Sequence, residues 1–272
     1  MKLKEISKVI DERIKKASRH YRHILKNFDE DAIHDFRVEI KKLRAFLRLL
    51  SVAVVGQESL KIPTQLKDFY TTVGDFRNLQ IHSQRISTLC HDLSLPQPDL
   101  YFRFLQNEQA TLKKNLHALA KTISWEKIKK ETGKDVPPAI QEDHCRAFLL
   151  HKKLYLQQLL ALPLSDEALH EIRKLLKDIL YNWQFIGLYA TGTLPATIAQ
   201  QKTIEALTTK LGDFQDLCTT TDLLQAYINN ENNPDTATLQ LLQQKLLSQK
   251  QAFKAAVCDD LMLIKEDVMR TF

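Results

Sequence analysis

The strongest constraint on the fold is the segment from His34 to Leu50, whose apolar and basic residues separate onto two faces of a helix. The apolar face contains Phe36, Ile40, Leu43, Leu47 and Leu50. The opposite face contains the residues that we call the first basic stripe: His34, Arg37, Lys41, Arg44 and Arg48. Aligned like charges repel each other by a few tenths of a kcal/mol per neighbouring pair. A stripe without an acid, with Asp35 and Glu39 expected to point elsewhere, therefore indicates a surface that binds an anion.

The same pattern recurs 136 residues later, where His170, Arg173 and Lys177 correspond to His34, Arg37 and Lys41. We call these three later residues the second basic stripe. Each copy follows an acidic segment, residues 29–31 and 165–167, which suits the capped N-terminus of a helix. The later positions differ between the copies, because Asp178, Leu180 and Gln184 stand where the first copy has Lys42, Arg44 and Arg48.

A second pair of matching blocks supports an internal duplication. Val73-Gly74-Asp75-Phe76-Arg77-Asn78-Leu79 corresponds to Leu211-Gly212-Asp213-Phe214-Gln215-Asp216-Leu217, 138 residues later. Glycine inside a helix costs about 1 kcal/mol relative to alanine. A glycine in both copies therefore suggests that another backbone comes close there through helix packing, or alternatively that the glycine lets an anion approach. We also expect Asp75 and Asp213 to orient a basic side chain of their own half, Arg37 or Arg173.

The whole chain is predicted to be all-α. Only 6 Gly and 8 Pro interrupt a sequence rich in Leu, Lys, Gln and Ala. Apolar residues at spacings of three and four predict helices over residues 3–27, a stripe helix ending near Gly56, 59–92, 99–123, 141–162, 166–191, 196–229 and 236–269. The predicted breaks are Pro96 with Pro98, the linker 131–140, Pro163, Gly192 with Pro195, and residues 229–234. We expect one domain over residues 1–272, made of two pseudo-symmetric four-helix bundles at 1–130 and 141–272.

Charge is unequally divided between the halves. Residues 1–140 carry a net charge of +9, and residues 141–272 carry a net charge of −3. An anionic partner would therefore be steered to the first half. No run of about 18 apolar residues predicts a membrane span, the N-terminus does not resemble a signal peptide, and the four cysteines form no C-x-x-C. These features favour a cytoplasmic protein with mostly buried thiols.

The two H-x-x-R-x-x-x-K blocks, each followed by an L-G-D-F-x-[N/D]-L-like block, resemble the CHAD domain, the conserved histidine α-helical domain. The resemblance implies an all-helical fold of two similar four-helix halves that binds inorganic polyphosphate along a basic central surface. We expect no catalysis and no cofactor, because the sequence lacks a cluster of carboxylates and a full set of metal ligands. With polyphosphate as the ligand, polyphosphate granules or polyphosphate-metabolising enzymes are the expected partners.

The residue types in the stripes suit phosphate recognition. Arginine forks and lysine point charges bind phosphate oxygens, and a histidine at a helix N-terminus adds a further donor once it is protonated. The predicted polyphosphate-binding residues are His34, Arg37, Lys41, Arg44, Arg48, His170, Arg173 and Lys177. The secondary candidates are Arg22, Lys42, Arg77, Lys174 and Tyr181. We expect the first half to contribute more than the second.

Two alternatives stay open. A nucleic-acid binder would use the same phosphate chemistry but should also stack bases on aromatic side chains. Most aromatic residues of this sequence lie at apolar positions of the predicted helices, which gives this alternative little support. A metal-dependent phosphohydrolase is suggested only by the His34-Asp35 and His91-Asp92 pairs, which lack further ligands in the sequence. His20 with His23 also lacks a third metal ligand nearby, so no metal site is predicted.

Overall fold

The computed structural model describes residues 1–54, 59–187, 198–230 and 236–271. This part of the chain contains nine helices and no strand, and its one β-type pairing is an isolated bridge between Lys2 and Ala139. The prediction of an all-α protein is therefore confirmed. The helices are α1 (Leu3–Asn27), α2 (Glu30–Ser51), α3 (Thr64–Asp92), α4 (Asp99–Ala120), α5 (Trp125–Thr132), α6 (Glu142–Leu160), α7 (Asp166–Gly187), α8 (Ile198–Asn230) and α9 (Thr236–Thr271).

The predicted helices agree with the observed ones to within a few residues, apart from one addition. The short helix α5 was not predicted, and it reaches into the expected linker 131–140. Ser124 caps α5, because its hydroxyl accepts a hydrogen bond from the backbone N–H of Lys127. Gly56, Gly192, Pro195 and Pro234, which were predicted to end helices, lie outside the described residues.

The segments before the two stripes cap their helices, the first through a carboxylate as predicted and the second through a serine hydroxyl. The Asp29 carboxylate accepts a 2.8 Å hydrogen bond from the backbone N–H of Ala32 at the start of α2. The Ser165 hydroxyl accepts a 3.1 Å bond from the N–H of Ala168 at the start of α7. Both helices therefore begin one turn before their stripe, which fixes where the basic side chains project.

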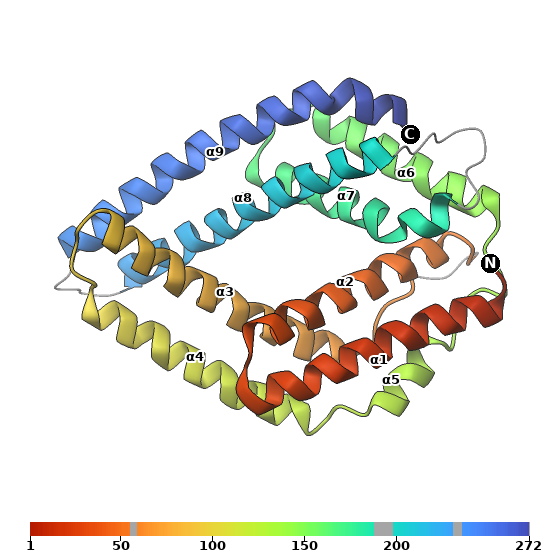
Figure 1. Cartoon of the computed structure of the whole chain (residues 1–272), viewed down its shortest axis with the longest axis horizontal. Helices are drawn as coiled ribbons and strands as arrows, with labels where there is room; N and C mark the ends of the chain where they lie inside the picture. Colours follow the sequence, from red (N-terminus) through yellow and green to blue (C-terminus); the bar gives the residue numbers. More distant parts are fainter. Residues whose placement is uncertain (55–58, 188–197, 231–235, 272) are drawn as a thin grey trace.

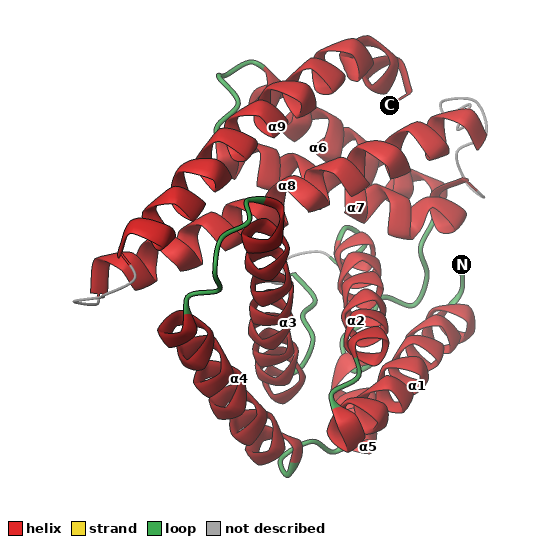
Figure 2. Ribbon diagram, turned by 60° about the vertical axis from the view of Figure 1, so that its left-hand side comes forward, coloured by secondary structure: helices red, strands yellow, loops and turns green. Residues whose placement is uncertain are grey.

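The two halves of the chain pack in the same order. In the first half α1 contacts α2, α2 contacts α3, and α3 contacts α4; in the second half α6, α7, α8 and α9 follow the same sequence of contacts. The halves then meet through α2 against α7 and α3 against α8, as Figures 1 and 2 show. The helices that carry the repeated blocks therefore make most of the contacts between the halves. The division into repeats at 1–130 and 141–272 stays a prediction.

The apolar face of α2 fills the core of the first half. Phe36, Ile40 and Leu43 are fully buried, and burying one such side chain contributes about 1.5–3 kcal/mol. Asp35 and Glu39 turn toward α1, where Asp35 lies 3.8 Å from His20 and Glu39 pairs with Arg13 at 3.0 Å. The acids next to the first basic stripe thus point away from it, as predicted.

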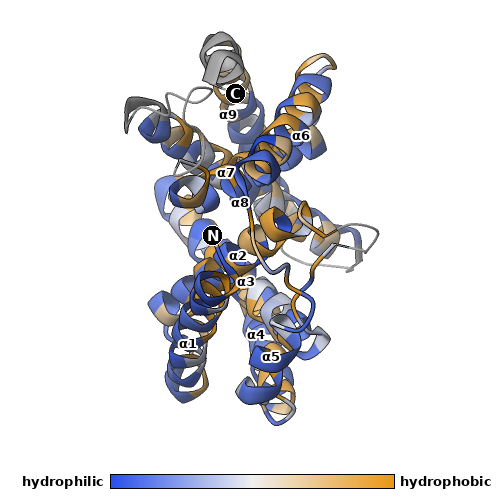
Figure 3. Ribbon diagram, turned by 90° about the vertical axis from the view of Figure 1, so that its right-hand side faces the viewer, coloured by the Kyte–Doolittle hydropathy of each residue, from blue (hydrophilic) through white to orange (hydrophobic). Residues whose placement is uncertain are grey.

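The second half has its own core, and a third apolar cluster joins the two halves where α3 and α4 meet α8 and α9. In the view of Figure 3, α1 and α5 lie on one side of the junction between the halves and α6 and α7 on the other. No described helix is long and apolar enough to cross a bilayer. All four cysteines are free thiols, and Cys90, Cys145 and Cys218 are buried, as predicted.

The stripe helices α2 and α7 cross near their C-terminal ends. The fully buried side chain of Asn182 on α7 donates a 2.9 Å hydrogen bond to the carbonyl of Ala45 on α2 and a 2.8 Å bond to the carbonyl of Asp178. From this crossing the two helices diverge toward their N-termini, as Figure 1 shows. The basic residues that precede the crossing therefore face the space between the halves.

Candidate anion-binding cavity

A cavity of about 470 Å³ lies between the halves, bounded by α2, α3, α7 and α8. It takes its side chains from both copies of both repeated blocks. Its lining residues are Arg37, Lys41, Arg44, Arg48, Tyr70, Asn78, His170, Arg173, Lys174, Lys177, Asp178, Tyr181, Gln215, Asp216 and Thr219. The two basic stripes, predicted separately from the sequence, thus meet in one site.

The cavity carries a large excess of positive charge. Seven of its lining residues are Lys or Arg, and only Asp178 and Asp216 are acidic. Asp216 is partly buried, which raises the pKa of its carboxyl, and the nearby cations Arg173, Arg85 and Lys41 oppose this rise. Burying cations without matching anions is costly, because each loses hydration. A site of this composition favours a ligand that carries several negative charges.

Arg37 is one of the partly buried cations that α2 contributes to the cavity. Burial lowers the pKa of its guanidinium, while Tyr70, Asp216 and Asp75 favour the charged form. The guanidinium carbon lies 5.4 Å from the centre of the Tyr70 ring, within cation–π range. Arg44 approaches the same ring at 5.5 Å. Tyr70 therefore holds two arginines of the first stripe beside each other at the wall of the cavity.

The repeated glycines make room for these arginines. A Cβ at Gly74 would lie 2.1 Å from a terminal nitrogen of Arg37, and a Cβ at Gly212 would lie 3.4 Å from a terminal nitrogen of Arg173. The neighbour of each glycine is thus a guanidinium of its own half. The expected close approach of another backbone was wrong for these positions. The Nε of Arg173 is buried and has no hydrogen-bond partner among the described residues, so this fork retains an unused donor.

Replacing Gly74 with alanine should lower affinity for an anion without destabilising the protein. The new Cβ would push the flexible end of Arg37 away from its place, while a helical Gly→Ala change stabilises by about 1 kcal/mol. We expect an affinity loss of roughly tenfold, the equivalent of one weakened charge-assisted hydrogen bond. Titration of polyphosphate binding and thermal unfolding of the same variant measure the two effects.

Gly212→Ala is the matched control, because a Cβ there meets Arg173 at ordinary contact distance. This variant should gain similar stability and keep its affinity within about twofold, since the helix propensity term is the same. Equal affinity losses in both variants would contradict the positioning role of Gly74.

Lys41 lies where the two stripes come together. Burial lowers the pKa of its ammonium group to about 7, and the nearby charges of Arg37, Arg173 and Lys177 add to this shift. Burial and Arg173 also lower the pKa of Lys177, whose ammonium lies 5.7 Å from the centre of the Tyr181 ring. A bound anion would favour the charged form of both lysines.

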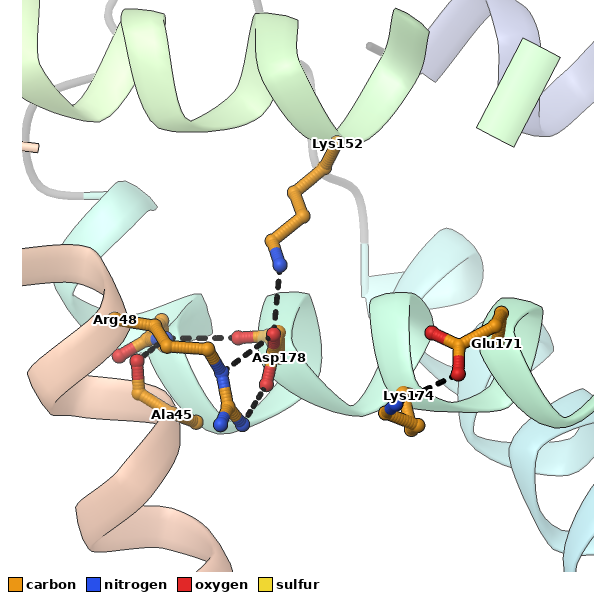
Figure 4. Close-up of polar contacts among 7 residues, drawn as sticks. Ala45, Arg48, Lys152, Glu171, Lys174 and Asp178 are labelled. Atoms are coloured by element: carbon orange, nitrogen blue, oxygen red, sulfur yellow. Dashed lines mark hydrogen bonds and ion pairs between the residues drawn. The ribbon is translucent and has the colours of Figure 1, made fainter. Parts of the chain in front are cut away.

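Arg48 lines the cavity but is already paired. Its Nε donates a 2.8 Å hydrogen bond to Asp178, and one of its terminal nitrogens contacts the other carboxylate oxygen. Lys152 on α6 donates a further 2.7 Å bond to Asp178. Figure 4 shows this carboxylate held between the two cations.

The two histidines of the stripes differ in their surroundings. His170 lines the cavity, and its Nδ1 donates a 2.7 Å hydrogen bond to Oε1 of Gln215, which leaves Nε2 for a ligand. His34 is exposed at the start of α2 and is not among the lining residues. The equivalent of Gln215 in the first half is Arg77, whose terminal nitrogen pairs with Glu30 at 2.6 Å.

The secondary candidates fall into two groups. Lys174 and Tyr181 line the cavity. Arg22, Lys42 and Arg77 do not belong to its described lining: Arg22 is exposed on α1, and Lys42 lies 3.6 Å from Glu39. As a group, the lining residues therefore come from α2, α3, α7 and α8 alone.

Sequence reasoning missed the polar residues that α3 and α8 contribute. These are Tyr70, Asn78, Gln215, Asp216 and Thr219. A signal was present, because Tyr70 and Asn78 lie four residues before and after Gly74, and Gln215 and Thr219 lie three and seven residues after Gly212, on the glycine face of each helix. Asp75 and Asp213, predicted to orient the arginines, form no ion pair with a described residue, although Arg37 opposes the rise that burial causes in the pKa of Asp75.

No group of three or more His, Cys, Asp or Glu side chains that could hold a metal ion occurs among the described residues. The two His-Asp pairs lie away from the cavity lining. His91 and Asp92 are highly exposed at the end of α3, and Asp35 faces His20.

Comparisons with known proteins agree with this architecture. The family model of the CHAD domain matches residues 8–225, which is most of the chain. A crystal structure of the CHAD domain from the plant Ricinus communis is similar in fold, with a TM-score of 0.66 and 17% sequence identity over 94% of this chain and 91% of that chain. No curated protein matches the sequence.

Proposed function

The chain belongs to the CHAD domain family, and from this membership we propose that it binds inorganic polyphosphate, without catalysis, in the cavity between its two halves. The single observation that supports this most strongly is the charge of that cavity. Seven Lys or Arg side chains from both stripe helices surround it, with two Asp residues. Such an excess of partly buried cations costs stability in the empty protein and is relieved by a polyanion.

The length of the basic surface favours a linear ligand. At 1.5 Å per residue, Arg37 and Arg44 lie about 10 Å apart along α2, and His170 and Tyr181 lie about 16 Å apart along α7. A single phosphate ester would contact only a few of these groups. A chain of linked phosphates would offer an oxygen to each arginine fork and a negative charge to each lysine.

In this arrangement each half contributes a similar set of groups. Arg37 and Lys41 from α2 face Arg173 and Lys177 from α7. His170, near the N-terminal end of α7, adds a donor at Nε2 once its ring is protonated. Tyr70 and Tyr181 keep the cations in place through their ring faces. We propose that these residues, together with Arg44, contact the phosphate oxygens.

Competition for binding tests the proposal. A labelled polyphosphate of defined length should bind the pure protein and be displaced by unlabelled polyphosphate far more effectively than by DNA or RNA of equal phosphate concentration. All three competitors must be measured at one salt concentration, because phosphate contacts are salt-dependent. Equal displacement by nucleic acid would support the alternative of a nucleic-acid binder.

We also predict that the protein hydrolyses neither polyphosphate nor nucleoside triphosphates. Its cavity contains two carboxylates that face cations, whereas metal-assisted hydrolysis requires a cluster of ligands and an open metal position. Phosphate release should equal the protein-free control with Mg²⁺, with Mn²⁺ and with a chelator. Metal-dependent turnover that disappears in Asp35→Ala or Asp92→Ala would contradict this prediction.

The expected setting of the protein follows from the same ligand. We propose that it is a cytoplasmic protein that associates with polyphosphate granules as one domain of two repeats. Colocalisation of a fluorescent fusion with stained granules, and its loss in a variant without Arg37 and Arg44, tests this association.

A further inference from the structure

We propose that Asp178 takes the place of a ligand phosphate. Its carboxylate stays paired with Arg48 and Lys152, and it thereby sets one end of the ligand tract, the part of the cavity that a bound polyanion can occupy. The inference rests on the proposed function. It concerns how much of the first basic stripe is available to the ligand, and it predicts that Arg48, although it lines the cavity, makes no contact with polyphosphate.

The contacts around Asp178 resemble those that a phosphate would receive. Arg48 approaches both carboxylate oxygens with two nitrogens of its fork, and Lys152 donates a 2.7 Å bond to one of them. The Asp178 side chain is only 5% exposed. This is bidentate recognition with a second cation, the arrangement that arginine and lysine use for phosphate. Figure 4 shows the two cations reaching the carboxylate from α2 and α6.

A polyanion could displace Asp178 only at high cost. Removing Arg48 from the carboxylate would leave a buried negative charge with Lys152 alone, and broken buried pairs are strongly destabilising. An incoming phosphate would also be repelled by the carboxylate itself, because Asp178 lies in the cavity lining. The anchored contact between Asn182 and Ala45 lies directly beyond it. The carboxylate and the helix crossing together therefore close this end.

The sequence shows that this feature belongs to one half only. Asp178 corresponds to Lys42 in the first half, where the lysine pairs with Glu39. Leu180 and Gln184 likewise replace Arg44 and Arg48. The second half thus supplies an anion and neutral side chains at the positions where the first half supplies three cations. The tract for the ligand is therefore asymmetric, with its closed end at Asp178.

A double-mutant cycle tests the inference through Asp178→Asn, Arg48→Met and the combination of the two. Asparagine keeps the size of the side chain and one accepting oxygen for Arg48. Affinity for a long polyphosphate and its dependence on salt are measured for all four proteins. In the native background Arg48→Met should change affinity by less than about threefold, the size expected of a cation that does not touch the ligand.

Asp178→Asn should release Arg48 and Lys152 to the ligand. We expect affinity to rise roughly tenfold, and the slope of log affinity against log salt to steepen by about 0.7 per added contact, the value for single-stranded nucleic acid. In this background Arg48→Met should cost most of the gain. Asp216→Asn is the matched control, because it removes the same charge from the same cavity and should show no coupling to Arg48.

The outcomes decide whether Arg48 is held by Asp178 or contacts the ligand. If Arg48→Met costs the same affinity in both backgrounds, Arg48 is an ordinary ligand residue and the inference is wrong. If Asp178→Asn or Arg48→Met does not fold, Arg48→Lys and Arg44→Lys are compared in the native background, because lysine keeps a positive charge beside Asp178, and equal losses contradict the inference. Failure of the native protein to bind polyphosphate contradicts the proposed function instead, so the two failures are distinguishable.

Discussion

Replacing both Arg37 and Arg44 with alanine should lower affinity for polyphosphate by about 100-fold or more, because each hydrogen bond to a charged group contributes about 1.5–3 kcal/mol. Both guanidinium groups lie at the Tyr70 ring on the wall of the cavity. The salt dependence of binding should also become less steep, since fewer counterions are released when fewer phosphates are neutralised. Isothermal titration at three or more salt concentrations measures both effects.

The corresponding change in the second half, Arg173→Ala with Lys177→Ala, should have the same direction and a smaller size. This half lacks counterparts of Arg44 and Arg48, so its contribution to the tract is shorter. Lys130→Ala with Lys134→Ala is the control for net charge, because both lysines are exposed and form no ion pair with a described residue. Similar losses in all three variants would mean diffuse attraction and would contradict a shaped site.

Binding should also weaken by roughly tenfold per pH unit above pH 7, because one unit of pKa corresponds to a factor of ten in the equilibrium between charged and neutral forms. The empty protein holds the pKa of Lys41 at about 7, and a bound polyanion would return it toward its ordinary value. Binding therefore takes up a proton once the pH exceeds the pKa of the empty site. Titrations in buffers of different ionisation enthalpy between pH 7 and 9 would count that proton.

Lys41→Met is the variant that isolates this effect. It should bind more weakly at pH 7 and lose most of the pH dependence, with Lys177 responsible for any remainder. The free energy of unfolding of the empty protein should increase as the pH rises, whereas its affinity for the ligand decreases. A lysine whose pKa is lowered by folding binds fewer protons when folded, so the empty native protein gains stability as the pH rises from 7 toward the ordinary lysine value. The variant should be the more stable protein at pH 7, and a pH dependence equal to that of the native protein would exclude Lys41 as its source.

Much of the fold could be predicted from the sequence, because helices such as α1, α2 and α7 have an apolar face that repeats every three or four residues. The face of α2 that contains Phe36, Ile40 and Leu43 is fully buried, as its spacing predicts. The short helix α5 was missed since eight residues carry too little periodicity to separate a helix from a polar linker. The pairing of α2 with α7 rests on contacts across more than 130 residues of sequence, which local patterns do not encode.

The basic residues of the cavity could be predicted, because their positive charge and helical spacing are visible in the sequence. Arg37, Lys41, Arg44, Arg173 and Lys177 were predicted and line one cavity. The state of each cation was not predictable, because it depends on partners from other helices. Arg48 meets Asp178 from the second half, and Gly74 proved to face an arginine rather than a backbone. Tyr70 and Asp216 were not predicted to line the cavity, because neither lies in a recognisable motif of binding residues and their role depends on the helix opposite.

The position of the cavity at the junction of the two halves has a consequence for its origin. A shorter ancestor with a single copy of the repeat would have had to form a two-fold dimer to enclose the same space. In such a dimer every substitution appears twice, so both copies of a position always carry the same residue. Two copies in one chain are free of that restriction. Lys42 and Asp178 now differ at corresponding positions, which a symmetric assembly of identical chains cannot achieve.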